Sequence, residues 1–304
     1  MNAKVLKFIG WLVVCMIIII MFQWILLRMS VNEKSMLIIK QACFSIYMFT
    51  PTFAAIITEK GNIKKLISEY RITLKNINVK KLIQYFAATA ILIPLLILFI
   101  TYILGNIGGI GYLGQILWGH NSSYFNNIIL PDNFFLKFGS LVLISLGLNV
   151  FVGLVSNIIP TFGGEIGWRG FLQNNITFSD TKKSLFIGFI WGFWNIPLIL
   201  LNTGKNLNEY LATICVKILL CIACSFYFTK ALRETRTLFA PIVMQGLISS
   251  CSLIFLIGGY ANYLIAGTQG LVSVVSIMLV NMLFLRKSSL FRQRNVSGKV
   301  CAVV

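Results

Sequence analysis

The sequence predicts an all-α integral membrane protein, built as a single bundle of about eight transmembrane helices. The first indication is composition: 58% of the 304 residues are hydrophobic and only 11% are charged, which is not the balance of a water-soluble domain. The second is a series of apolar stretches long enough to cross roughly 30 Å of hydrocarbon as helices. These stretches lie at about 6–28, 36–58, 82–104, 136–160, 184–201, 209–230, 238–257 and 262–285.

The domain organisation follows from these stretches. The first is too long for a signal peptide and has no small-residue cleavage site after it, so we expect an uncleaved helix. Neither an internal repeat nor a coiled-coil heptad is apparent. We expect N-terminal helices in 1–135 with a basic cytoplasmic loop at 59–81 and an outer loop at 105–135, a core bundle in 136–285, and a basic tail in 286–304.

The charge of the chain predicts its orientation. Lysines and arginines outnumber acids by 26 to 8, and twenty of these basic residues fall on one side if eight helices alternate. By the positive-inside rule that side is the cytoplasm, so we expect both termini there, in the plasma membrane. The lipid bilayer, and not a nucleic acid, is the partner that this charge indicates.

Several catalytic classes are excluded by what the chain lacks. His120 is the single histidine, so one chain cannot build a zinc site with two or three imidazoles or an HExxH motif. A serine hydrolase would lack a histidine base within the bundle. Only Glu165 of the eight acids falls in a segment that the bundle should enclose, which excludes a two-carboxylate aspartyl mechanism. We therefore expect no metal and no cofactor.

Glu165 and Arg169 are the charged residues that need a partner. They are four residues apart, so on a helix they share a face and can neutralise one another. One interpretation is a purely structural ion pair. The other is a direct chemical role for Glu165, because isolated buried carboxylates in membranes are often functional.

Further polar residues recur inside the predicted spans. Asn149 lies between Ser145 and Ser156 at helical spacing, and Lys217 lies eight residues into its span. These residues suggest a polar cavity within the bundle, lined by Asn149 and Lys217. Interhelical hydrogen bonds alone would explain most of them equally well. Asn195, Gln245, Ser249 and Asn281 belong to the same group.

Three segments together resemble a known family. They are GGEIGWRGFL at 163–172, GFIWGFWNIPL at 188–198 and APIVMQGLIS at 240–249. This order and separation is similar to the CPBP (Abi, CAAX-protease-like) family of intramembrane proteases. PTFAAIIT at 51–58, just before a basic loop, is similar to that family's upstream helix.

The sequence departs from that family at the residues that carry chemistry. The family's first motif has two adjacent glutamates and an arginine four residues after the second, whereas here the positions hold Gly164, Glu165 and Arg169. In the second motif Trp191 matches an aromatic residue, but Asn195 replaces a histidine. In the third, Gln245 and Ser249 stand in place of a histidine and an asparagine.

The resemblance implies peptide-bond hydrolysis near the cytoplasmic face. In the family, the first glutamate and a histidine activate water, in an arrangement that can include a metal, and the last pair stabilises the oxyanion. Gly164 cannot accept a proton, and the amides of Asn195 and Gln245 are neither acids nor bases near neutral pH. We therefore expect the family scaffold without a competent catalytic residue.

Three functions remain under consideration. The leading hypothesis is a non-catalytic binding or regulatory protein of a low-GC bacterium, acting in bacteriocin immunity or cell-envelope regulation, with a peptide or another membrane protein as partner. The second is an active intramembrane endopeptidase that uses Glu165. The third is a small-solute carrier with Lys217 as a coupling residue.

Overall fold

The computed structural model describes a helical membrane protein. It covers residues 2–27, 33–62, 77–108, 111–112, 134–200, 206–251, 259–260, 264–265 and 267–284. Over these ranges the chain is helical apart from short turns and one antiparallel pair of two-residue strands, β1 (Gly111–Tyr112) and β2 (Gly259–Tyr260). The prediction of an all-α membrane protein is confirmed. His120, most of the basic loop at 59–81 and the basic tail at 286–304 lie outside the described residues.

The helices follow the predicted apolar stretches. Two π-helical segments occur within these helices and are labelled η1 and η2. The helical elements in chain order are α1 (Ala3–Leu27), α2 (Glu33–Met48), α3 (Thr50–Thr58), α5 (Val79–Ala87), η1 (Ala88–Leu92), α6 (Ile93–Gly108), α7 (Phe134–Val155), α8 (Ile158–Glu165), η2 (Ile166–Leu172), α9 (Gln173–Asn175), α10 (Asp180–Trp194), α11 (Ile196–Leu200), α12 (Leu207–Thr235) and α13 (Phe239–Ser250). A final helix spans Leu271–Phe284.

Length and composition show several membrane helices. Within the described residues four helices are long and apolar enough to cross a bilayer, and a fifth span results if the bent pair Val142–Val155 and Ile158–Asn175 counts as one. Ala42–Thr58, Phe239–Ser250 and Leu271–Phe284 are apolar but shorter. Every predicted stretch thus contains an apolar helix, and the number that crosses the membrane stays a prediction.

Two predicted spans are interrupted, and the sequence supplies the reasons. The stretch at 36–58 breaks at Phe49, because Pro51 occupies the first turn of α3, where a residue without an N–H fits best. The stretch at 136–160 ends as a helix at Val155, and the chain bends by 55° before α8 begins. Asn157 in this bend donates from Nδ2 to the carbonyl oxygen of Gly246, 3.2 Å away, which fixes the bend against α13.

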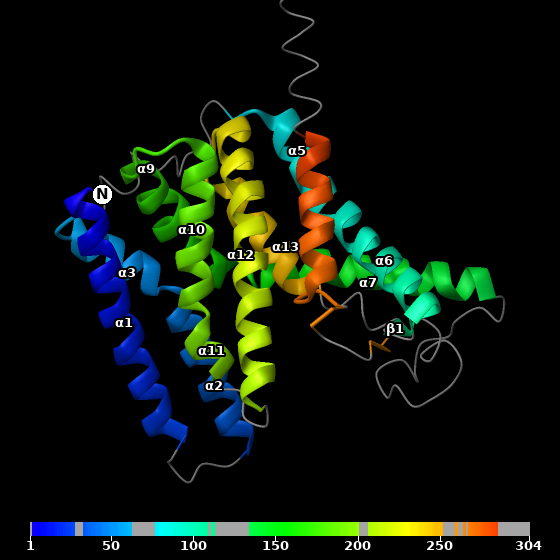
Figure 1. Cartoon of the computed structure of the whole chain (residues 1–304), viewed down its shortest axis with the longest axis horizontal. Coiled ribbons are helices and arrows are strands. Elements are labelled where there is room, and N and C mark those ends of the chain that lie inside the picture. Colours follow the sequence, from blue (N-terminus) through cyan, green and yellow to red (C-terminus); the bar gives the residue numbers. More distant parts are fainter. Residues whose placement is uncertain are drawn as a thin grey trace, which may run out of the picture.

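The centre of the molecule is the packed pair α10 and α12, which run side by side in Figure 1. Glycines allow their close approach: a Cβ added at Gly188 would lie 2.5 Å from the Cα of Ile222. α12 itself begins at a capping box in which the side chain of Asn206 accepts from the backbone N–H of Glu209 and the Glu209 carboxylate accepts in return. In the same view α1 lies on one flank, α5 and α6 lie on the other, and α7 is steeply inclined to α12.

Charged residues gather at one end of the bundle. The starts of α1, α5 and α10, the end of α12 and the end of the final helix all lie there (Figure 1), and we call it the basic end. Its ion pairs are Lys4–Glu59 at 2.8 Å, Lys81–Glu234 at 2.8 Å and Arg233–Asp180 at 2.7 Å. This clustering is what a positive-inside arrangement requires of basic residues that are far apart in the sequence.

Candidate functional site

The first motif forms the most deeply buried helix of the described structure. α8, η2 and α9 form one helical segment from Ile158 to Asn175, here called the motif helix, and residues 163–172 are all buried. Its middle, η2, is a π-helical stretch, a local widening of the helix that often occurs at functional sites. The motif helix packs against α3 and α13, and it contacts α10 through η2.

Glu165 and Arg169 form the ion pair that their spacing predicts. Arg169 Nη1 lies 2.8 Å from Glu165 Oε1, and both side chains are 0% exposed. The guanidinium carbon also lies 4.7 Å from the ring centroid of Trp191 and 5.1 Å from that of Phe228. The cation is therefore held by a carboxylate and by two aromatic faces, contributed by α10 and α12.

This pair retains unused hydrogen-bonding capacity. Among the described residues, Glu165 Oε2, Arg169 Nε and Nη2, and the indole nitrogen of Trp168 have no hydrogen-bond partner. Buried polar atoms without partners are costly, so these four atoms on one helix are the groups with hydrogen-bonding capacity left to use.

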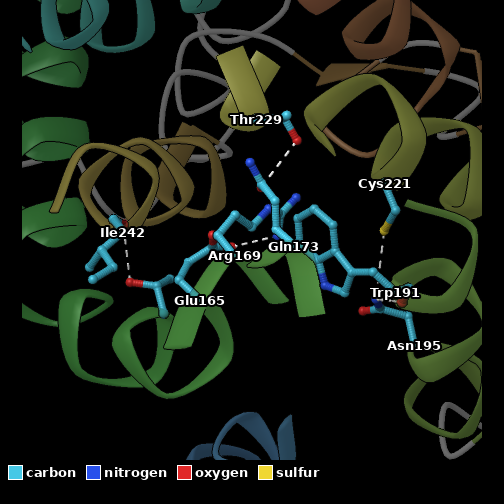
Figure 2. Close-up of polar contacts among 9 residues, drawn as sticks. Glu165, Arg169, Gln173, Trp191, Asn195, Cys221, Thr229 and Ile242 are labelled. Carbon is cyan, nitrogen blue, oxygen red and sulfur yellow. Dashed lines mark hydrogen bonds and ion pairs between the residues drawn. The ribbon is translucent and has the colours of Figure 1, made fainter. Parts of the chain in front are cut away.

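A polar stripe extends the pair along the motif helix. Thr161 Oγ1 donates to the carbonyl oxygen of Ile242 on α13 at 3.2 Å, and Thr229 Oγ1 on α12 donates to Gln173 Oε1 at 3.3 Å. Figure 2 shows Glu165, Arg169, Gln173 and Trp191 in one view. Our sequence analysis missed Thr161 and Gln173, although their four-residue spacing from Glu165 and Arg169 was a signal that could have found them.

The Asn195 side chain forms a hydrogen bond within its own helix, at the end of α10. Its Nδ2 donates to the carbonyl oxygen of Trp191 at 2.7 Å and lies 3.7 Å from Cys221 Sγ (Figure 2). Trp191 therefore joins the first two motifs, with its ring under Arg169 and its carbonyl bonded to Asn195. The amide at position 195 caps a helix end, where a histidine of the family would act as an acid or base.

The third motif is only partly brought into the interior. Gln245 is 5% exposed, and its Oε1 has no partner within the described ranges. Ser249 is exposed. Its neighbour Ser250 is the buried hydroxyl, donating to Asn149 Oδ1 at 2.7 Å. Position 249 therefore does not join position 245 on the buried face, and no sequence pattern indicated that Ser250 would be the buried serine.

The two residues predicted to line a cavity have other surroundings. Asn149 is fully buried and bonds to Ser250, so it ties α7 to α13 as an interhelical hydrogen bond does. Lys217 Nζ donates to Gln269 Oε1 at 2.8 Å in an exposed position. Lys217 thus pairs with an amide and not with an acid.

The upstream helix holds the first two motifs together. Thr52 Oγ1 donates to the carbonyl oxygen of Gly163, and Trp194 Nε1 donates to Thr50 Oγ1 at 2.8 Å. Tyr47 OH donates to the carbonyl oxygen of Trp194 at 2.7 Å, and the Tyr47 and Trp194 rings stack 4.8 Å apart. α2 and α3 therefore brace the motif helix against α10.

The glycines of the first motif differ in the space around them. A Cβ at Gly163 would lie 2.6 Å from the Phe49 ring, and one at Gly167 would lie 2.3 Å from the Cβ of Pro51. At Gly164 the nearest atoms are the Trp168 indole at 3.7 Å and the Met48 carbonyl oxygen at 3.8 Å. Gly163 and Gly167 are thus required by packing, whereas a methyl group fits at Gly164, beside the unpartnered indole N–H of Trp168.

The residues at the motif positions do not fit a metal ion. Gly164, Asn195 and Gln245 supply no carboxylate and no imidazole, and Glu165 is already bound by Arg169. In the part of the chain that the structure describes, no group of three or more histidine, cysteine or acidic residues is close enough to share an ion. The arrangement offers amide and carboxylate oxygens for hydrogen bonding.

We predict that Arg169→Ala destabilises the protein more than Glu165→Gln does. The first variant leaves a buried carboxylate uncompensated, at a cost of about 3–5 kcal/mol. The second also leaves a buried charge without its counter-ion, but the guanidinium keeps the two aromatic faces and an amide acceptor, so the loss should be smaller. Thermal unfolding in detergent measures the difference, and wild-type melting temperatures for both variants would contradict a structural role for the pair.

A second prediction compares the motif glycines. Gly164→Ala should fold with wild-type yield, because its new methyl group makes only van der Waals contacts. Gly167→Ala should lose about 1–3 kcal/mol or fail to fold, because the methyl group overlaps Pro51. Detergent-solubilised yield and melting temperature test this, with the helical Gly147, whose added Cβ meets nothing within 4 Å, as the control position. Equal losses at 164 and 167 would show that Gly164 is also a packing residue.

One comparison with known proteins bears on this site. Residues 146–283 match the family model described as type II CAAX prenyl endopeptidase Rce1-like, and this range contains all three motif segments. Among curated proteins, no relative matches the chain. The resemblance seen in the motifs is thereby confirmed: over residues 146–283, the chain is similar to the Rce1-like family of CAAX prenyl endopeptidases.

Proposed function

We propose that the protein is a non-catalytic member of the CAAX-protease-like family, which binds a peptide or another membrane protein at the motif helix without cleaving it. One observation carries the proposal. Gly164 and Asn195 stand where the resemblance places the family's water-activating groups, and Gln245 stands where it places a histidine of the oxyanion pair. A scaffold with unpartnered buried polar atoms, in which Arg169 holds the one buried carboxylate of the motif helix, is better suited to recognition than to hydrolysis.

The binding groups would be the atoms of the motif helix that lack partners. Glu165 Oε2 accepts, while Arg169 Nη2 and Trp168 Nε1 donate. Such a set matches a peptide backbone, which has both a donor and an acceptor at each residue. All three groups are fully buried in the present structure, so binding would require the surrounding helices to separate.

An active endopeptidase remains the second candidate, because one observation favours it. Glu165 Oε2 is free of the ion pair and could accept a proton from water. The carrier hypothesis receives no such support, since Lys217 is bonded to Gln269 in an exposed position and no acid faces it among the residues described.

The setting that we propose is the plasma membrane of a bacterium, in bacteriocin immunity or cell-envelope regulation. The chain is rich in isoleucine, lysine and asparagine, as proteins of low-GC bacteria are. The basic end of the bundle would face the cytoplasm, together with both termini. A gene neighbourhood that encodes a bacteriocin would favour immunity, and one that encodes a sensor kinase would favour regulation.

The catalytic prediction is that the purified protein leaves prenylated CAAX-type peptides and leader peptides uncut, with product at the level of a no-enzyme blank. Mass spectrometry of the peptide after prolonged incubation measures this. Turnover by the wild type that disappears in Glu165→Gln would overturn the proposal and make Glu165 the general base.

Restoring the family's residues provides the matched control. Gly164→Glu, Asn195→His, Gln245→His and Ser249→Asn in one protein should recover weak hydrolysis, because a Cβ at position 164 overlaps no neighbouring atom. Single changes should recover none, since catalytic groups act as a unit. A triple variant that keeps Ser249 should hydrolyse the peptide as fast as the quadruple variant does, because Ser249 is exposed.

The topology prediction is that the basic end faces the cytoplasm. In a variant without native cysteines, a cysteine introduced at Gly61, near the basic end, should resist a membrane-impermeant thiol reagent in intact cells. A cysteine introduced at Asn206, at the start of α12 and the opposite end of the bundle, should react. The reverse pattern would invert the proposed orientation, and reaction at both positions would contradict it.

A further inference from the structure

A cleft on the surface of the bundle is lined by none of the motif residues. It has a volume of about 480 Å³, within the range of small-ligand sites. One wall follows the helix α5–η1–α6 and the other is the end of the final helix. The lining residues are Gln84, Ala87, Ala88, Ile91, Leu92, Leu95, Leu283 and Phe284, and we call this cleft the outer groove.

The outer groove is apolar and open to the side. Apart from Gln84, its lining side chains are all hydrophobic. Ile91 is 49% exposed and Leu283 is 55% exposed, so the walls face the surroundings of the bundle, which in a membrane are lipid chains. Ala87 and Ala88 are small and create the hollow. Behind it, the rings of Phe284 and Tyr85 stack with centroids 4.4 Å apart, which gives the groove a rigid floor.

The length of the groove matches one leaflet. From Gln84 to Leu95 the helix rises by about 15 Å at roughly 1.5 Å per residue. The hydrocarbon core of a bilayer is roughly 30 Å thick, so one leaflet is about as deep as the groove is long. A single acyl chain lying along α5–η1–α6 would therefore fill it from end to end.

One end of the groove is positively charged. Lys80 and Lys81 precede Gln84 by one helical turn, at the basic end (Figure 1). Lys81 pairs with Glu234 at 2.8 Å. Lys230 lies 4.0 Å from the same carboxylate, and its buried Nζ has no hydrogen-bond partner among the described residues.

Phe284 connects this charged cluster to the groove. The Nζ of Lys230 lies 5.9 Å from the centroid of the Phe284 ring, which also lines the groove. The single carboxylate of Glu234 is thus shared by two lysines, and Lys80 is exposed beside them.

We propose that the outer groove is a binding site for an anionic phospholipid, with one acyl chain along Gln84–Leu95 and the phosphate at Lys80 and Lys81. A neutral lipid could fill the apolar part, but it would leave the excess of lysines uncompensated. Basic residues at the membrane surface attract anionic headgroups at about 1 kcal/mol each, or about fivefold in affinity. The site is independent of the proposed function, because none of its residues belongs to the motif helix.

Native mass spectrometry of the full chain in detergent tests the site. The protein is offered phosphatidylglycerol and phosphatidylcholine with identical acyl chains, and the retained lipid is counted. The wild type should retain phosphatidylglycerol in preference, and Lys80→Gln should reduce that preference about fivefold. Lys182→Gln is the matched control: it removes an exposed lysine near the start of α10, at the same basic end, and should change nothing.

Filling the groove tests the acyl-chain part. Ala87→Trp, at an exposed position, should abolish retention of both lipids, whereas Leu211→Trp, on an exposed surface of α12, should not. If Ala87→Trp does not fold, Ile91→Trp fills the groove from its more exposed wall. Equal retention of the two lipids by the wild type, or equal effects of Lys80→Gln and Lys182→Gln, would overturn the proposal. If Ala87→Trp abolished a dimer of the chain while lipid was still retained, the groove would be assigned to a second copy of the chain. That result would also overturn the proposal.

Discussion

The burial of Arg169 is the constraint on which the core of this bundle depends. A guanidinium at 0% exposure inside a membrane protein must be neutralised and surrounded, since an unpaired buried ion costs several kcal/mol. Glu165 supplies the counter-charge from the same helix, and the rings of Trp191 and Phe228 supply two faces from α10 and α12. The contacts that the Arg169 cation makes with Trp191 and Phe228 therefore hold the motif helix against α10 and α12.

Close backbone approach makes that arrangement possible. The rings can reach Arg169 only because α10 lies tightly on α12, which Gly188 and Gly192 permit, and because α3 lies tightly on η2, where Gly167 meets Pro51. Packing of small residues is the main source of helix association in a membrane, where lipid is as apolar as the side chains. Substitutions at these glycines therefore act on the site although none of them touches Arg169.

The sequence predicted the features that depend on local spacing. Hydropathy located the apolar helices, and the four-residue interval predicted the Glu165–Arg169 pair. Features set by contacts between distant segments were not predictable: Gln269 binds Lys217, and Ser250 is buried where Ser249 is exposed. In a soluble helix the apolar face would have separated the two serines, but lipid-facing and core-facing sides of a membrane helix are equally apolar.

The contrast between Gly164 and Gly167 supports our proposal that the family scaffold persists here without its catalytic groups. Position 167 is fixed by a backbone contact, so any side chain there disturbs the fold. At position 164 an added Cβ makes only ordinary contacts, beside an unpartnered indole N–H, so the packing does not require a glycine there. Asn195 likewise satisfies its amide locally through the carbonyl oxygen of Trp191. Residues that do chemistry are therefore easier to lose than residues that pack, because the fold does not depend on them.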